Sequence, residues 1–142
     1  MKETSEETAS PDETFAFAFE LARRNPEASF FYLHGDLGAG KTLFTKGIAS
    51  FLGIDPSRVA SPTFALVQRH GGGRRTLYHI DLYRIEDERE LSELGIEELE
   101  EEGAVVVVEW GEKLGRRIRE DAIDVTLEVA GENRRRIQIR CP

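Results

Sequence analysis

Apolar residues in the first half of the chain follow two different spacings. In residues 10–24 they recur every three or four positions, which predicts a helix with Ser10 as its N-cap. The buried face of that helix is expected to contain Phe15, Ala18, Phe19 and Ala22. A short apolar, aromatic run over residues 29–34 then predicts a strand. Helical spacing returns over residues 43–52 and ends before Gly53, so a second helix is expected there.

The middle of the chain alternates strand-like and helix-like patterns. Residues 63–70 and 74–83 are strand-like and separated by three glycines, which indicates an antiparallel hairpin. Residues 86–102 are acidic and favour a helix. Residues 104–110 contain four consecutive valines, a pattern typical of a strand buried on both faces of a parallel sheet.

The last part of the chain predicts a second hairpin. Residues 123–130 and 134–140 alternate apolar and polar positions around a Gly-Glu-Asn turn. Residues 1–10 are polar and are expected to be flexible. The mixture of elements indicates an α/β class for a single domain over residues 1–142, with a mixed, mostly parallel central sheet and antiparallel hairpins.

Composition limits the kinds of function. The 142 residues are 39% hydrophobic and 32% charged, and no apolar run approaches the roughly 20 residues of a membrane span. A single cysteine, Cys141, excludes an internal disulfide and fits a cytoplasmic protein. The net charge of −8 argues against unaided nucleic-acid binding. The basic runs at residues 116–119 and 134–136, like the acidic segment 86–102, are interpreted as solvated faces, with docking of a basic partner as the alternative for the acidic one.

One motif between the first strand and the second helix predicts chemistry. It fits the phosphate-binding pattern G-x-x-x-x-G-K-[ST] in full. Glycines let the backbone turn tightly and approach a phosphate, which the N-terminus of the next helix also attracts. Lys41 would reach the β- and γ-phosphates of a nucleotide, and the Thr42 hydroxyl would bind Mg²⁺. The residues of the motif are Gly35, Asp36, Leu37, Gly38, Ala39, Gly40, Lys41 and Thr42.

Two acidic residues end strand-like runs and are candidates for the same site. Glu109 follows the valine run, and Asp81 ends the strand before it; carboxylates at strand ends can bind Mg²⁺ or orient water. Thr63 lies where phosphate-loop switch proteins place a threonine that senses the γ-phosphate. His79 is interpreted as a partly buried strand residue. Trp110 is interpreted as packing, with a place over a bound nucleotide or partner as the alternative.

Together these motifs resemble the TsaE family of bacterial ATPases, which serve threonylcarbamoyladenosine formation on tRNA. The resemblance rests on "GDLGAGKT", "SPTF.LV", "H.DLYR", "ELGIEE" and "VEW.E" in that order, and extends from about Phe30 to Lys113. One departure is Gly111, where the family usually has proline after the tryptophan.

The resemblance implies a P-loop NTPase-like, three-layer fold, binding of ATP and Mg²⁺, and slow hydrolysis. It also implies work with the proteins TsaD and TsaB, so that tRNA is reached only through that complex. By motif, Lys41 and Thr42 match the phosphate-loop pair and Glu109 the acid at Mg²⁺. Asp81 matches the aspartate of "H.DLYR", Thr63 the switch-like threonine, and Trp110 the tryptophan beside the site.

Two alternatives to this function remain open. One is a small phosphate-loop kinase, in which the arginines of residues 116–119 would form a lid, although no acceptor-binding motif is evident. The other is a nucleotide-dependent binding switch whose hydrolysis is incidental. The chain has no Asn-Lys-x-Asp segment, the usual guanine-reading element of GTPases, so adenine is the favoured base.

Overall fold

The chain folds around one mixed sheet of seven strands. The computed structural model describes residues 2–36, 38–60, 67–99, 103–110 and 119–142. The strands are β1 (Lys2–Thr8), β2 (Phe30–His34), β3 (Val67–His70), β4 (Leu77–Asp81), β5 (Val105–Glu109), β6 (Ile123–Val129) and β7 (Arg135–Cys141). The helices are α1 (Pro11–Arg24), α2 (Lys41–Phe51), α3 (Glu88–Glu93) and α4 (Ile96–Leu99), with a 3-10 turn, η1, at Pro56–Arg58.

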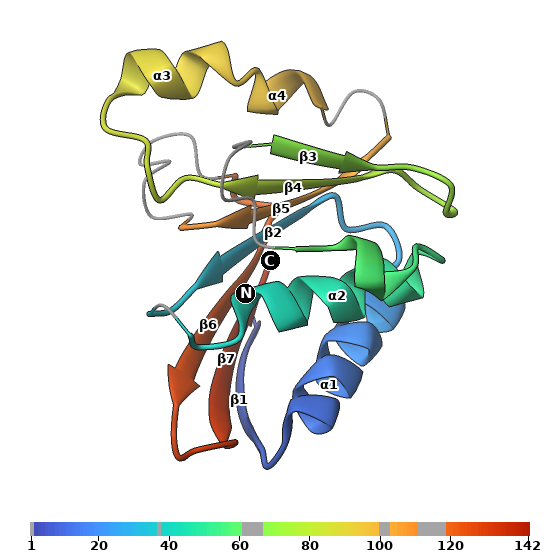
Figure 1. Ribbon diagram of the computed structural model, residues 1–142, viewed down its shortest axis with the longest axis vertical. Helices are drawn as coiled ribbons and strands as arrows, with labels where there is room; N and C mark the ends of the chain where they lie inside the picture. The colour runs from blue at the N-terminus through green and yellow to red at the C-terminus, as the bar shows by residue number, and fades with distance from the viewer. Residues whose placement is uncertain (1, 37, 61–66, 100–102, 111–118) are drawn as a thin grey trace.

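The strand order is β1-β7-β6-β2-β5-β4-β3 (Figure 1). Four consecutive strands of this order, β6, β2, β5 and β4, are parallel to one another. The β3–β4 and β6–β7 pairs are antiparallel hairpins, as predicted. The predicted α/β class, with a mixed and mostly parallel centre, is therefore confirmed.

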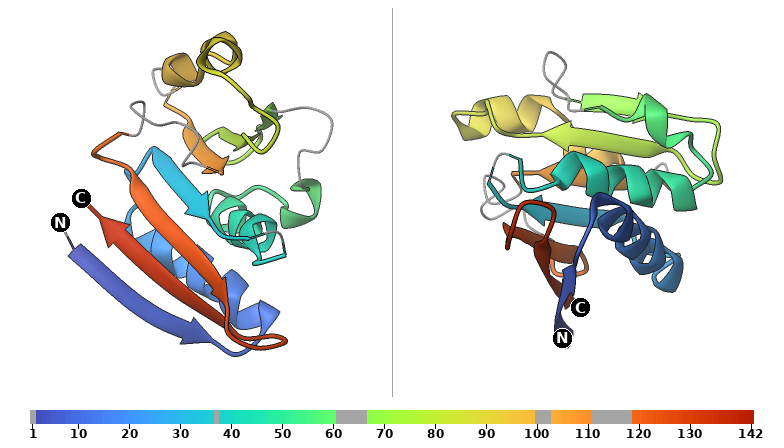
Figure 2. Two further views of the ribbon diagram at one scale, coloured as in Figure 1. Left: turned by 90° about the vertical axis from the view of Figure 1, so that its left-hand side faces the viewer. Right: turned by 60° about the horizontal axis from the view of Figure 1, so that its bottom comes forward.

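Two hydrophobic cores lie on the two faces of this sheet. The first core packs α1 and α2 against alternate residues of the strands, such as Phe31, Leu33 and Val107. The second core packs Leu91 and Ile96 of α3 and α4 against the opposite face. The ribbon views show these two helices on the other side of the sheet from α1 and α2 (Figure 2). Every residue of β5 is buried, because this central strand is covered on both faces. That is the environment its run of valines predicts.

Helices α1 and α2 cross closely at Gly47. A Cβ atom added there would lie 2.5 Å from the carbonyl oxygen of Phe15 and 2.6 Å from the Cβ of Ala18. Both distances are shorter than real side chains tolerate, so only glycine permits this crossing. The close contact fixes α2, and with it the phosphate-loop motif that precedes it, against the rest of the first core.

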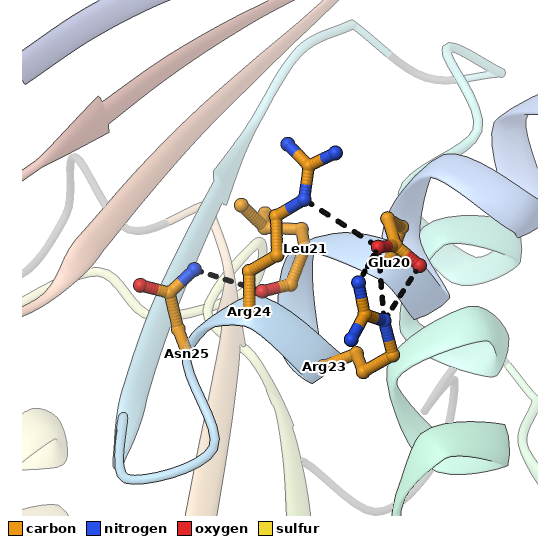
Figure 3. Close-up of polar contacts among 5 residues, drawn as sticks. All are labelled: Glu20, Leu21, Arg23, Arg24 and Asn25. Atoms are coloured by element: carbon orange, nitrogen blue, oxygen red, sulfur yellow. Dashed lines mark hydrogen bonds and ion pairs between the residues drawn. The ribbon is translucent and has the colours of Figure 1, made fainter.

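The ends of α1 follow local sequence signals. Ser10 is the N-cap, and its hydroxyl accepts a hydrogen bond of 3.1 Å from the backbone N–H of Glu13. At the other end, Glu20 contacts Arg23 and Arg24 (Figure 3). The Asn25 side chain donates to the carbonyl of Leu21 at 2.8 Å (Figure 3). These contacts satisfy terminal backbone groups of the helix and complement its dipole.

Two segments differ from expectation. The prediction that residues 1–10 are flexible is wrong for Lys2–Thr8, which pair antiparallel with β7 as the edge strand β1. Backbone hydrogen bonds make this strand, while all but one of its side chains are exposed, so no apolar pattern marks it. The acidic segment 86–102 forms two short helices in its described part, separated by a turn at Gly95.

None of the helices in the described ranges combines the length and the apolar character needed to cross a membrane.

Candidate functional site

Three neighbouring parallel strands end at the edge of the sheet that carries the phosphate-loop motif. Leu33 of β2 pairs with Glu109 of β5, and Glu109 pairs with Asp81 of β4. The motif begins directly after β2, so the topology brings both predicted acids beside it. Ligands of open α/β sheets bind at this carboxyl edge.

The glycines of the motif hold backbone that other residues rarely adopt. Gly35 has φ +146°, and a Cβ atom there would lie 2.6 Å from the carbonyl oxygen of Leu127. Gly40 is the N-cap of α2 with φ +103°. Because glycine has no side chain to cap the helix, the first N–H groups of α2 remain available to an anion such as a phosphate.

Lys41 is held inside this loop. Lys41 is the first residue of α2 and is only 5% exposed. The ammonium donates a hydrogen bond of 2.5 Å to the carbonyl of Gly35 and lies 3.9 Å from the centre of the Trp110 ring. A buried ammonium needs such partners, and these two contacts hold the Lys41 charge within the glycine loop.

Glu109 is the most deeply buried acid among the described residues of the site. It is 3% exposed, and its Oε2 is hydrogen-bonded to Nε2 of His79, which is fully buried. Buried carboxylates require a hydrogen-bond partner, and here a histidine on the neighbouring strand provides it. The contact joins β4 to β5 at the edge of the sheet where the motif lies.

Asp81 lies next to Glu109 and is partly buried. Burial raises the pKa of the Asp81 carboxyl, a hydrogen bond from the Tyr83 backbone N–H lowers it, and the Glu109 carboxylate raises it further. The main cause is burial, and the two neighbouring carboxyl groups are oxygen donors that could hold a cation.

Trp110 is set by an unusual backbone conformation. Its φ is +61°, which no other non-glycine residue of the described ranges adopts. Its backbone N–H donates to the carbonyl of Leu33 at 3.2 Å, so the turn out of β5 stays attached to β2. The ring contacts that of Tyr83, with 5.1 Å between ring centres, and covers Lys41. Left-handed backbone at a large residue is strained and is found mostly at functional sites.

Arg135 of the β6–β7 hairpin supports the loop from outside. Its guanidinium donates to the carbonyls of Ala39 at 2.9 Å and Gly38 at 3.3 Å, and also to that of Arg134 at 2.8 Å. The hairpin thereby fixes the conformation of the phosphate-loop motif.

A second histidine–carboxylate pair lies immediately before the loop. Nε2 of His34 is hydrogen-bonded to Oδ1 of Asp124 on the adjacent strand β6. Their side chains are 20% and 33% exposed, so water reaches this pair.

The structure brings together most of the residues that the motifs predict. Lys41, Asp81, Glu109 and Trp110 converge at one edge of the sheet, and Thr42 follows Lys41 as a partly buried residue of α2. Asp36 and Gly38 are exposed on the loop, whereas Ala39 is buried. Leu37 and Thr63 lie outside the described residues. The roles assigned to all of these residues stay predictions.

The sequence patterns missed two residues that contribute to the candidate site. From the sequence, His79 is interpreted as a partly buried strand residue, yet it is fully buried and hydrogen-bonded to Glu109. Its place two residues before Asp81, on the same face of the strand, was a signal for the site. Arg135 is interpreted there as part of a solvated basic run, and nothing in the local pattern separates it from its two neighbours.

Known proteins resemble this chain over nearly its whole length. The model of the family described as "Threonylcarbamoyl adenosine biosynthesis protein TsaE" matches residues 8–137. The chain belongs to the TsaE family. A TsaE protein of Bacillus subtilis is 39% identical over 137 residues, covering 96% of this chain and 85% of the relative. One from Treponema pallidum is 35% identical over 130 residues, covering 92% and 95%.

A solved structure has the same fold. The crystal structure of Bacillus subtilis YdiB superposes with a TM-score of 0.74 at 29% identity, covering 99% of this chain and 86% of that one. The suspected TsaE resemblance is thus confirmed, and the chain belongs to a family of tRNA threonylcarbamoyladenosine biosynthesis.

Proposed function

We propose that this TsaE-family chain binds ATP with Mg²⁺ and hydrolyses it slowly, in support of threonylcarbamoyladenosine modification of tRNA by a complex of TsaD and TsaB. The observation that carries the proposal is the convergence of Lys41 with Glu109 and Asp81 around a glycine loop at the start of α2. A lysine, a glycine loop for the phosphates and acidic side chains are parts that nucleotide hydrolysis requires.

The donor atoms at this edge fit Mg²⁺. The Thr42 hydroxyl and the carboxylates of Glu109 and Asp81 are hard oxygen ligands of the kind that Mg²⁺ prefers, and Glu109 and Asp81 are paired on adjacent strands. Thr42 and Glu109 would hold the ion. When bound, Mg²⁺ would neutralise charge on the phosphates during hydrolysis.

The chain's own residues would do three things in the reaction. Lys41 would bind the β- and γ-phosphates, and the N–H groups of the loop would surround them. Glu109 and Asp81 would orient the attacking water, which adds to the γ-phosphorus as the bond to the β–γ bridging oxygen breaks. Arg135 would keep the loop in shape through the carbonyls of Gly38 and Ala39.

The charge of the chain supports a route to tRNA through protein partners. With a net charge of −8, it repels the RNA backbone on average. A complex that already holds tRNA would supply the basic surface that binds the RNA. This chain would act on that complex through ATP binding and hydrolysis.

Phosphate release from ATP, measured with and without TsaD and TsaB, tests the function. We expect slow release by the chain alone and faster release with both partners. Transfer of phosphate to a small acceptor, without any effect of the partners, would favour a kinase instead. Partner binding that depends on ATP but not on its hydrolysis would favour a binding switch.

Calorimetric titration of ATP into Lys41→Ala tests the site. We expect the variant to lose tight binding, by on the order of 100-fold or more, because the loop loses its charge on the phosphates. Lys46→Ala is the matched control, since Lys46 lies on the same helix α2 outside the motif. Equal ATP affinity of Lys41→Ala and the unmodified chain would refute the phosphate-loop assignment.

A further inference from the structure

His79 is buried next to the proposed site without belonging to any phosphate-binding motif. Its ring is fully shielded from solvent, on β4, two residues before Asp81. On the adjacent strand β5 it pairs with Val107, so its side chain reaches diagonally to Glu109. Strand β4 therefore contributes both an acid and a hydrogen-bond partner for the second acid.

The two ring nitrogens of His79 have different surroundings. Nε2 is hydrogen-bonded to Oε2 of Glu109, whereas Nδ1 is buried and has no hydrogen-bond partner among the described residues. The tautomer with its proton on Nε2 satisfies this arrangement, because that N–H donates to the carboxylate and no N–H is buried at Nδ1 without an acceptor. The contact engages one oxygen of Glu109 and fixes the plane of the carboxylate.

Packing alone does not account for a histidine here. An apolar residue would fill the same space, next to Leu77 and Val107 of the first core, and would leave no buried nitrogen without a partner. A buried polar atom without a partner costs free energy, and in a native protein it calls for an explanation, such as a functional requirement. The requirement visible at this position is the orientation of Glu109.

We infer that His79 is a positioning residue, which holds the Glu109 carboxylate in the orientation that Mg²⁺-dependent hydrolysis needs. The inference rests on the proposed function in one respect, that Glu109 acts on the nucleotide's metal ion. His79 itself touches neither nucleotide nor metal. It acts through a single hydrogen bond to Glu109, in the way that partners of ligating groups orient them in other metal sites.

The chain offers close controls for this inference. His70 on β3 is also buried, and its Nε2 also has no partner in the described part of the chain, but no contact joins it to Glu109. Gln68 pairs directly with His79 across the β3–β4 hairpin. Substitutions at these residues disturb the same buried region without removing the donor to Glu109.

Two amide substitutions at position 79 separate the hydrogen bond from packing. The side-chain nitrogen of glutamine reaches about as far as Nε2, whereas that of asparagine reaches only about as far as Nδ1. We expect His79→Asn to lower kcat by about 10- to 100-fold, while ATP affinity measured in EDTA stays unchanged. His79→Gln should retain most of the activity, and His70→Gln should match the unmodified chain. Circular dichroism melts check that each variant is folded.

A second measurement needs no nucleotide. The chain has three histidines, so nitrogen-15 labelling of histidine gives few signals, and His79→Gln identifies those of residue 79. In the apo protein we expect a bonded proton on Nε2 and a bare Nδ1. Glu109→Ala should shift this Nε2 proton and leave the other histidine signals in place.

The possible failures can be told apart. If the unmodified chain hydrolyses ATP and His79→Asn equals it in kcat and in Mg²⁺ dependence, the positioning role is refuted while the proposed function stands. The positioning role is also refuted if the proton of His79 lies on Nδ1 and its signal does not shift in Glu109→Ala. If the unmodified chain shows no Mg²⁺-dependent ATP binding, the proposed function fails, and the labelled spectra still report whether His79 donates to Glu109.

Discussion

Two histidine–carboxylate pairs lie near the carboxyl ends of the parallel strands, and they differ mainly in burial. His79 and Glu109 join β4 to β5, with side chains 0% and 5% exposed. His34 and Asp124 join β2 to β6, with side chains 20% and 33% exposed. By strand alternation the first pair lies on the face of the first core, with α1 and α2, and the second pair on the opposite face.

The difference teaches what burial adds to the same chemical contact. Around His34 and Asp124, water can replace either partner, so this hydrogen bond adds little to stability. Around His79 and Glu109, water cannot replace either partner, so each buried side chain depends on the other for its hydrogen bond. We therefore expect the buried pair to be rigid and the exposed pair to be replaceable.

The largest expected effect comes from removing the acid of each pair. Glu109→Ala leaves the buried His79 without its acceptor and should lower the free energy of unfolding by about 2 kcal/mol. Asp124→Ala should lower it by less than about 1 kcal/mol. Urea denaturation of both variants measures the difference. Equal losses would contradict the contrast in burial.

The same variants should differ in catalysis. Glu109→Ala should reduce ATP hydrolysis more than ATP binding, because the acid is assigned to the Mg²⁺ ion, and Asp124→Ala should change neither. Steady-state phosphate release and calorimetry give the two quantities. Normal turnover by Glu109→Ala would remove this acid from the site.

Arg135 adds a third case to the comparison, because it is only partly buried yet donates to two carbonyls of the phosphate-loop motif, those of Gly38 and Ala39. Arg135→Ala should weaken ATP binding by about tenfold, since the phosphate loop would lose its outer support and would have to be ordered on binding. The matched control is Arg136→Ala, whose exposed side chain contacts only Glu7 and Glu128 among the described residues. Equal affinities of the two variants would argue against the support role.

The smallest effect concerns His70, a buried histidine without a carboxylate partner in the described ranges. Burial lowers the pKa of His70, with Arg58 and then His79 adding to the effect. Below about pH 6.5 the unfolded chain binds a proton there that the folded chain does not. Stability should therefore fall as pH falls through that range, and His70→Gln should reduce the slope. Thermal melts between about pH 5 and pH 7.5 check this, and parallel curves for both proteins would refute it.

Local patterns predicted much of the fold because they describe local physics. The N-cap at Ser10 and the helical spacing after it produce α1, and the valine run produces the central strand β5. The edge strand β1 escaped prediction, because its bonds to β7 use the backbone and leave its side chains exposed.

The candidate site divides in the same way. Lys41 and Thr42 follow from a contiguous motif, and Asp81 and Glu109 follow from their places at strand ends. The partnership of His79 with Glu109 depends on the register of β4 against β5, over a separation of 30 residues. No local pattern encodes that register.

The sequence by itself therefore determined the loop, the acids and the family resemblance, because each is written in adjacent or regularly spaced residues. Only the tertiary structure decided which histidine is buried against its acid and which remains at a solvated edge. It also decided that one arginine of three supports the loop, and that Trp110 takes left-handed backbone over Lys41. The physical reason is that burial and long-range pairing, which set the strength of these contacts, exist only once the strands are side by side.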